Sequence, residues 1–122
     1  MTSKALPPQV GPYSLARKAA GLIFVSGQLP IDPATGKLVT GGIEEQTAQV
    51  LSNIENILES MGQGLKDVIR CEIFLKDLNN FAKVNELYGK RFSSDPKPAR
   101  FTVEVARLPL DAMIEIACIA TS

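Results

Sequence analysis

The chain has 122 residues, with 13 Lys and Arg against 13 Asp and Glu and no histidine. This length suits one domain, expected over residues 1–122, whose core buries about two-thirds of the unfolded surface. The balanced charge gives no field that would attract nucleic acid or an anionic membrane, and the lack of histidine excludes His-based triads and argues against catalytic zinc or iron.

The two cysteines, Cys71 and Cys118, lie in apolar alternating runs and not in Cys-x-x-Cys spacing. The pattern is typical of buried thiols in a reducing compartment, although two cysteines leave a disulfide open. No apolar run reaches the length of a signal peptide or a membrane span. We therefore expect a cytoplasmic protein with no membrane partner.

The first third of the chain predicts two strands and two turns. Residues 1–11 are polar and Pro-rich, which predicts an extended arm. Tyr13–Lys18 is expected to pair as a hairpin with Leu22–Ser26, whose unbroken apolar run is typical of a strand covered on both faces. Gly27 then permits close approach to the backbone, and Asp32–Lys37 has the composition of a turn.

The segment from about Ile43 to Met61 has the periodicity of an amphipathic helix. Glu44 and Glu45 lie in its first turn, and Gly62 ends it. Its apolar stripe consists of Thr47, Val50, Leu51, Ile54, Ile57, Leu58 and Met61.

Val68–Leu75 alternates as a strand, followed by a second helix that Asp77 or Asn79 caps and that runs to about Phe92. One strand face is expected to hold Ile69, Cys71, Ile73 and Leu75, and a mixed face Val68, Arg70, Glu72 and Phe74. The helix has an apolar stripe of Phe81, Val84, Tyr88 and Phe92. Asn85 also lies on this stripe, which is unusual for an amide.

Two further alternating strands lie between Pro98 and Ser122. In the first, we expect Phe101, Val103 and Val105 to face the core while Arg100, Thr102 and Glu104 face the other side. In the second, the predicted core residues are Ile114, Ile116, Cys118 and Ala120, which places Glu115 on the same side as Arg100. The order predicts an α+β fold with two helices on one sheet face. Whether these two strands are neighbours or flank Val68–Leu75 stays open.

The uncovered sheet face is predicted to mix apolar and charged side chains. Its expected members are Val68, Phe74, Thr102, Met113, Arg70, Glu72, Arg100, Glu104 and Glu115. Because so much apolar area is unfavourable in water, we expect other subunits to cover this face. Clefts between subunits are natural ligand sites.

Four blocks resemble the RidA family, also called YjgF: residues 11–14 (Gly-Pro-Tyr-Ser), 26–30 (Ser-Gly-Gln-Leu-Pro), 84–88 (Val-Asn-Glu-Leu-Tyr) and 98–105 (Pro-Ala-Arg-Phe-Thr-Val-Glu-Val). The resemblance continues through residues 106–109 and 114–116. It implies a chorismate-mutase-like α+β domain, with a mixed sheet, that forms a homotrimer with clefts between subunits. It also implies hydrolytic deamination of 2-aminoacrylate, 2-iminobutanoate and 2-iminopropanoate to 2-keto acids and ammonia.

Carried over by position, the family's substrate-carboxylate arginine is Arg100 and its water-positioning glutamate is Glu115. The site tyrosine is Tyr13, the close-approach glycine is Gly27, and Asn85 lies near the cleft. A guanidinium can bind a carboxylate in a bidentate manner, and a desolvated glutamate can exchange protons with water and the departing nitrogen. Such substrates also hydrolyse spontaneously, so no metal and no cofactor is expected.

Thr102 departs from the family, because many bacterial members have a cysteine there. Its backbone can still bind substrate, but a reactive thiol at this position is excluded. Arg100 is retained, which favours the active subgroup, although arginines on strands more often lie in solvated ion pairs. Two alternatives stay open: a ligand-sensing or protein-binding module without turnover, and the ribonuclease or translation-inhibitor activity ascribed to some members. The charge balance and the 6% aromatic content speak against a nucleic-acid partner.

Overall fold

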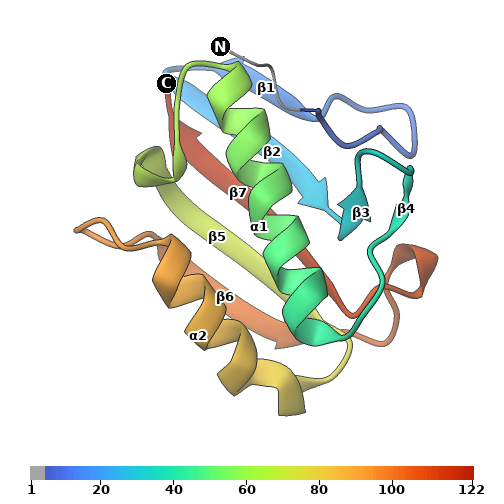
Figure 1. Cartoon of the computed structure of the whole chain (residues 1–122). Coiled ribbons are helices and arrows are strands. Elements are labelled where there is room, and N and C mark those ends of the chain that lie inside the picture. Colours follow the sequence, from blue (N-terminus) through green and yellow to red (C-terminus); the bar gives the residue numbers. More distant parts are fainter. Residues whose placement is uncertain (1–4) are drawn as a thin grey trace.

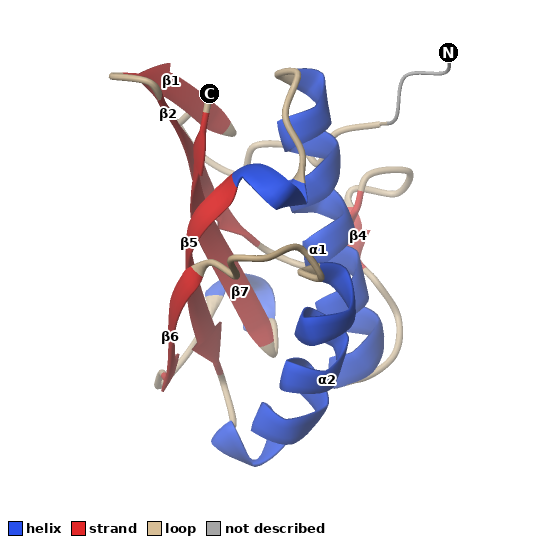
Figure 2. Ribbon diagram, turned by 90° about the vertical axis from the view of Figure 1, so that its left-hand side faces the viewer, coloured by secondary structure: helices blue, strands red, loops and turns tan. Residues whose placement is uncertain are grey.

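A computed structural model describes residues 5–122 as a five-stranded mixed sheet with two helices on one face (Figures 1 and 2). The sheet order is β1-β2-β7-β5-β6, and only the β5–β6 pair is parallel. The strands are β1 (Ala16–Ala19), β2 (Leu22–Gln28), β5 (Val68–Leu75), β6 (Ala99–Glu104) and β7 (Ile114–Thr121). The last two strands therefore flank β5, which answers the question of strand order.

The prediction of two helices over one face is confirmed by α1 (Ile43–Ser60) and α2 (Phe81–Arg91). The Gly42 amide donates to Glu45 Oε1 at 2.8 Å at the start of α1, and Gly62 leaves the helix with a φ of +81°. Asp77 accepts from the Asn79 amide at 2.9 Å and caps a short 3-10 turn, Leu78–Asn80. The prediction that Asp77 or Asn79 caps the second helix itself is wrong, because α2 begins after Asn80, whose side chain forms no capping bond.

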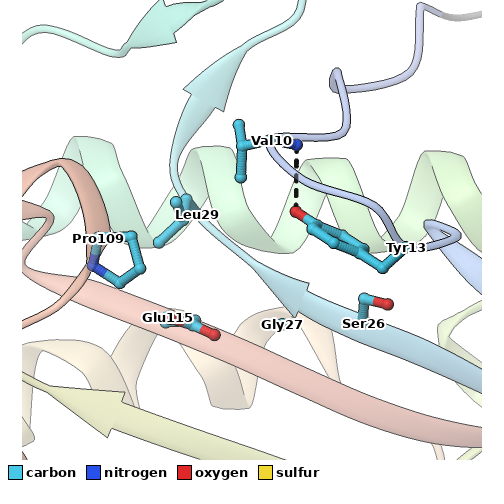
Figure 3. Close-up of a pocket in the computed structure, with 7 residues that line it drawn as sticks. All are labelled: Val10, Tyr13, Ser26, Gly27, Leu29, Pro109 and Glu115. Carbon is cyan, nitrogen blue, oxygen red and sulfur yellow. Dashed lines mark hydrogen bonds between the residues drawn. The ribbon is translucent and has the colours of Figure 1, made fainter.

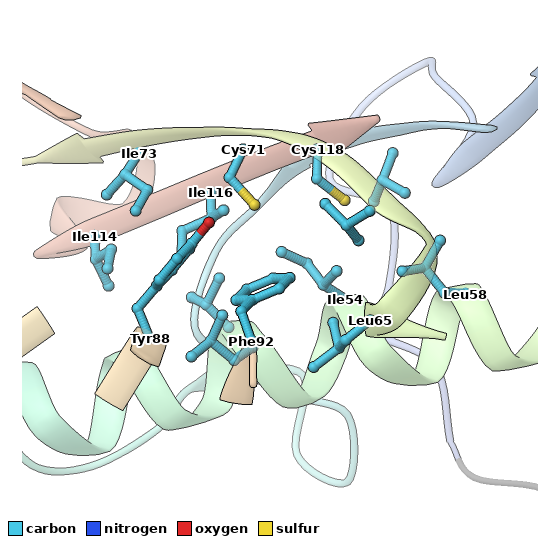
Figure 4. Close-up of a cluster of buried hydrophobic side chains, with 14 of the residues drawn as sticks. Ile54, Leu58, Leu65, Cys71, Ile73, Tyr88, Phe92, Ile114, Ile116 and Cys118 are labelled. Carbon is cyan, nitrogen blue, oxygen red and sulfur yellow. The ribbon is translucent and has the colours of Figure 1, made fainter. Parts of the chain in front are cut away.

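The core lies between α1, α2 and the covered sheet face, and Figure 4 shows its centre. Residues of the predicted α1 stripe are buried as expected, from Thr47 to Leu58, and Met61 packs against the cluster. Cys71 and Cys118 are free, buried and register partners on β5 and β7, so the prediction of packed thiols is confirmed. Burial raises the pKa of the Cys71 thiol to about 11 and also raises the pKa of Cys118.

Two short strands, β3 (Ile31–Asp32) and β4 (Lys37–Leu38), form a small hairpin that the sequence did not predict. The expected turn at Asp32–Lys37 is the turn of this hairpin. The first predicted strand also begins later than expected, at Ala16 and not at Tyr13. Of the predicted arm, residues 1–4 lie outside the described part of the chain.

The prediction for the faces of β5 is wrong at its first two residues. Val68 is buried at 4% exposure while Ile69 is 44% exposed, because the register between β5 and β7 shifts between Val68 and Arg70. Such an irregularity adds one residue and reverses the alternation locally. Beyond it, Cys71 and its alternate neighbours face the core as expected.

The prediction for the faces of β6 is also wrong. Arg100 is the register partner of Cys71, and Thr102 is the partner of Ile73, so both face the helices. Phe101 instead packs edge-on against Phe74 on the uncovered face. Residues expected on that face but found toward the helix side are Val68, Arg100, Thr102, Glu104 and Met113.

Candidate active site

An open cleft of about 370 Å³ lies on the uncovered side of the sheet, beside β2 and β7 (Figure 3). The N-terminal segment, the end of β2 and the loop before β7 form its walls. Its lining residues are Val10, Tyr13, Ser26, Gly27, Leu29, Pro109 and Glu115. Three of the predicted site residues, Tyr13, Gly27 and Glu115, therefore meet in one place.

A bulge in β2 creates the floor of the cleft. Val25 pairs with Cys118 and Gln28 pairs with Ile116, so three residue steps on β2 oppose two on β7. This places Gly27 directly against Glu115. A Cβ atom at Gly27 would lie 2.0 Å from Glu115 Oε2, so only glycine leaves room for the carboxylate.

The Glu115 carboxyl is half-buried, and burial raises its pKa above the ordinary value. It forms no hydrogen bond or ion pair with any of residues 5–122, and it is the one charged side chain among the cleft residues named above. Leu29 and Pro109 form apolar walls nearby. A carboxyl in this setting can hold a water and exchange a proton with it.

Tyr13 forms the wall that the N-terminal segment contributes. Its hydroxyl accepts a hydrogen bond from the Val10 amide at 3.3 Å, and Gln9 Nε2 donates to its carbonyl at 2.5 Å. Ser26 Oγ donates to the Ser14 carbonyl at 2.6 Å and ties this segment to the bulge. The proton of the Tyr13 hydroxyl is left available for a ligand.

The loop between β6 and β7 brings Pro109 to the opposite wall. Leu110 and Asp111 both have a φ of +58°, a conformation that L-residues rarely adopt. An ion pair of 2.5 Å between Lys76 Nζ and Asp111 Oδ1 holds the loop. Sequence reasoning missed the cleft roles of Val10, Ser26, Leu29 and Pro109, although the last three lie in or beside the blocks that resemble the family.

Arg100 lies on the opposite face of the sheet from Glu115, so the structure does not bring these two predicted residues together in one chain. Its guanidinium lies over the Tyr88 ring, 4.8 Å from the ring centre, and 5.7 Å from that of Phe81. Within residues 5–122 it pairs with no carboxylate. Because β6 is an edge strand and Arg100 is exposed, another molecule can reach it.

The elements around Arg100 carry three buried polar atoms: Thr102 Oγ1, Asn85 Oδ1 and the Tyr88 hydroxyl. None of the three has a hydrogen-bond partner among the described residues. Thr102 shares the strand face of Arg100, and Asn85 precedes Tyr88 by one turn of α2. The Tyr88 hydroxyl points toward the Cys71 side of the core without the geometry of a hydrogen bond, and burial raises the Tyr88 pKa. We call Arg100, Thr102, Asn85 and Tyr88 the Arg100 cluster.

Among residues 5–122, no three His, Cys, Asp or Glu side chains are grouped so that they could hold a metal ion. Within the same range, no helix has the length and apolar character needed to cross a membrane. The polar side chains that line the cleft are those of Glu115, Tyr13 and Ser26.

The layered sheet and the bulge-lined cleft define an α+β protein of the YjgF-like fold. The family model described as Endoribonuclease L-PSP matches residues 3–122. The crystal structure of RidA from the Antarctic bacterium Psychrobacter has a TM-score of 0.92 and 41% identity, covering all of this chain and 97% of that one. The YjgF structure from E. coli has a TM-score of 0.88 and 40% identity, over 95% of this chain and 92% of that one.

Curated relatives agree with this likeness. A RutC family protein of Pyrococcus abyssi is 54% identical over 119 residues, which is 98% of this chain and 92% of that protein. Reactive Intermediate Deaminase A of Arabidopsis thaliana, named as chloroplastic, is 51% identical over 120 residues, or 98% of this chain and 63% of that protein. The chain belongs to the RidA/YjgF family.

Proposed function

We propose that this protein is a hydrolase of C=N bonds that deaminates reactive imino and enamino acids. The substrate class is 2-aminoacrylate, 2-iminobutanoate and 2-iminopropanoate, and the products are 2-keto acids and ammonia. The observation that carries this proposal is the Glu115 carboxyl, held against Gly27 in an apolar cleft with a raised pKa. The name of the Arabidopsis relative supports the same reaction type.

In the proposed reaction, Glu115 holds a water against the electrophilic C=N carbon. An enamine substrate first takes up a proton at C3 and loses one from nitrogen, which gives the imine. The carboxylate then accepts a proton from the water as the C–O bond forms, and it passes this proton to the substrate nitrogen. In the tetrahedral intermediate the carboxylate moves the hydroxyl proton to the nitrogen, so the C–N bond breaks, ammonia leaves and the keto C=O forms. The Tyr13 hydroxyl donates a hydrogen bond to the reacting centre, and desolvation by Leu29 and Pro109 keeps competing water away.

The substrate carboxylate requires a cation, and none lines the Glu115 cleft within the described residues. We propose that Arg100 of a neighbouring copy supplies it, with Thr102 and Asn85 beside it. Arg100 fits this role because it forms no ion pair within residues 5–122, lies on an edge strand and is pre-positioned over the Tyr88 ring. The site would then be shared between two subunits.

The uncovered face supports an assembly of this kind. It presents a stripe of apolar side chains that includes Phe24 at 43% and Val103 at 40% exposure. The other members of this stripe are Phe74, Phe101, Ala117 and Ile119. A homotrimer would bury this stripe and bring edge strand β6 of one copy toward the cleft of the next.

We also propose a domain organisation and a cellular location for this chain. Residues 1–122 would form one domain, and the protein would work in the cytoplasm with a small-molecule substrate. The Arabidopsis relative is named as a chloroplast protein, so its location differs from the one proposed for this chain.

The proposal is tested by adding the purified protein to a threonine dehydratase reaction that contains semicarbazide as a scavenging nucleophile. We expect faster formation of 2-ketobutyrate and less semicarbazone. Arg100→Ala should remove the acceleration while leaving the oligomer intact. Lys97→Ala, which removes a cation three residues away, is the matched control and should keep the acceleration. No acceleration by the wild-type protein would contradict the proposed function.

The description of the matching family model favours a second candidate, an endoribonuclease. The equal numbers of cationic and anionic residues and the absence of histidine speak against it. RNA cleavage that disappears in a Glu115→Gln variant would support this candidate, and cleavage that persists would indicate a contaminant. Binding of 2-ketobutyrate without turnover would instead support a ligand-sensing module.

A further inference from the structure

The helix α1 buries polar side chains on the face that packs against the sheet, where apolar residues are the rule. Gln46 is 7% exposed, Asn53 is fully buried, and the two lie seven residues apart, which is about two helical turns. Buried amides of this kind must find hydrogen-bond partners, and a buried amide is costly if its partner is removed. Both amides bond to backbone of segments that form the cleft.

Gln46 holds the start of β7. Its Oε1 accepts a hydrogen bond from the Met113 amide at 2.9 Å, two residues before Glu115. The Met113 carbonyl accepts from the Lys76 amide at 3.0 Å, so both backbone polar groups of Met113 are hydrogen-bonded. Movement of Met113 would move the backbone from which the Glu115 carboxyl projects toward Gly27.

Asn53 holds the end of the bulged strand. Its Nδ2 donates to the Ile31 carbonyl at 2.9 Å and to the Leu29 carbonyl at 3.3 Å. Gln49 Nε2 donates to Asn53 Oδ1 at 2.9 Å and fixes the orientation of the amide. Leu29 forms an apolar wall of the cleft and lies two residues after Gly27.

We propose that Gln46 and Asn53 are positioning residues, through which α1 sets the separation between the Glu115 strand and the Gly27–Leu29 wall. This inference rests on the proposed function, because the separation matters for a reaction at Glu115. Figure 1 shows that α1 packs over both β2 and β7. One rigid helix can therefore fix the position of the Gly27–Leu29 wall relative to the strand that carries Glu115. Misplacement by about 1 Å is enough to lower the rate of a positioned reaction by about 10²-fold.

The matched variants at position 46 are Gln46→Met and Gln46→Glu. Both substitutions keep the length of the side chain. Methionine loses the acceptor for the Met113 amide, and glutamate keeps it. Burial of a charge makes Gln46→Glu the less stable of the two, so a purely structural role predicts that it is also the less active. A positioning role predicts the reverse order of activity.

The second pair is Asn53→Asp and Asn56→Asp, the same change on the same helix. Aspartate at position 53 replaces the donor with an anionic oxygen that repels the Leu29 and Ile31 carbonyls. The Asn56 side chain forms no hydrogen bond or ion pair with any of the described residues, so its variant controls for the added charge. We expect Asn53→Asp to raise KM more than it lowers kcat, because the displaced wall contacts the substrate.

The experiment measures kcat and KM of the full-length variants together with amide hydrogen exchange at Met113, using Ile116 as an internal reference. We expect Gln46→Met to lower kcat/KM at least tenfold and to speed Met113 exchange at least tenfold relative to Ile116. Gln46→Glu and Asn56→Asp should change both quantities less than threefold. Equal activity of Gln46→Met and wild type would overturn the inference while leaving the proposed function in place.

If the wild-type protein shows no deaminase activity, the proposed function fails separately. The exchange data then decide the structural part: unchanged Met113 exchange in Gln46→Met would overturn it as well.

Discussion

Both faces of the sheet carry apolar side chains, but the helices cover only one of them. The helix-covered face is closed by α1 and α2, with Ile73 and Ile116 fully buried, whereas the other face leaves Phe24 43% exposed. The two proposed half-sites also divide between these faces, with Glu115 on the open side and Arg100 on the covered side. An apolar strand face is therefore not necessarily part of the core. In the proposed site, a second copy of the chain brings Arg100 to Glu115.

The largest expected effect compares two isoleucines on β5. Ile73 is fully buried and Ile69 is 44% exposed, so Ile73→Ala should lower the free energy of unfolding by about 2–5 kcal/mol and Ile69→Ala by less than about 1 kcal/mol. Urea unfolding at one fixed protein concentration measures both. Equal losses would mean that β5 lacks its register shift.

The next largest effect is a loss of deaminase activity on substitution of Gly27, which lies outside the core. Gly27→Ala places a Cβ atom at 2.0 Å from Glu115 Oε2 and should lower kcat/KM by about 10²-fold. Gly89→Ala, in α2 with no atom within 4 Å of the added Cβ, is the control. It should keep full activity and stabilise the chain by about 0.5–1 kcal/mol. Full activity of Gly27→Ala would contradict the packing of Glu115.

Several features of β7, of α1 and of the cleft could be predicted from the sequence. The period of β7 predicted correctly that Ile114 and its alternate neighbours are buried and that Glu115 faces away from them. The α1 stripe was equally clear, because its helical period extends over 18 residues. The resemblance to the family led to Tyr13, Gly27 and Glu115, which the structure places around one cleft.

The failures have physical causes that alternation cannot express. Arg100 lies on the helix side of the sheet because the ring of Tyr88 offers it a stacking surface, while Phe101 lies on the open face against Phe74. Alternation says only that these neighbours point in opposite directions. The bulge before Gln28 and the register shift after Val68 each add one residue, and neither leaves a distinct mark in the sequence.

A smaller effect tests whether the open face is covered by another copy. Phe24 and Leu78 are both 43% exposed, but only Phe24 lies on the open face. Phe24→Ser should weaken self-association by about 1–2 kcal/mol, or roughly five- to thirtyfold in the dissociation constant, and Leu78→Ser should leave it unchanged. Sedimentation velocity over a dilution series measures both. Equal behaviour would place the interface elsewhere.

The smallest effect is the pH dependence of stability. Burial raises the pKa of Glu115 from its ordinary 4.5, so the folded state binds this proton more tightly than the unfolded state does. The stabilisation from the protonated form is present below pH 4.5 and is lost as the pH rises through the raised pKa. Glu115→Gln should therefore match wild type in acid and exceed it slightly at neutral pH. A higher stability of wild type at neutral pH would contradict the desolvation of Glu115.

In the proposed reaction, Arg100 and Glu115 act in one site although a single chain holds them on opposite faces of the sheet. The direct measurement mixes inactive Arg100→Ala and Glu115→Gln subunits, after they have been unfolded and refolded together. If the site is shared, random assembly leaves about one quarter of the sites with both native residues, and about one quarter of wild-type deaminase activity should return. If both residues served the site of their own chain, the mixture would stay as inactive as its parents.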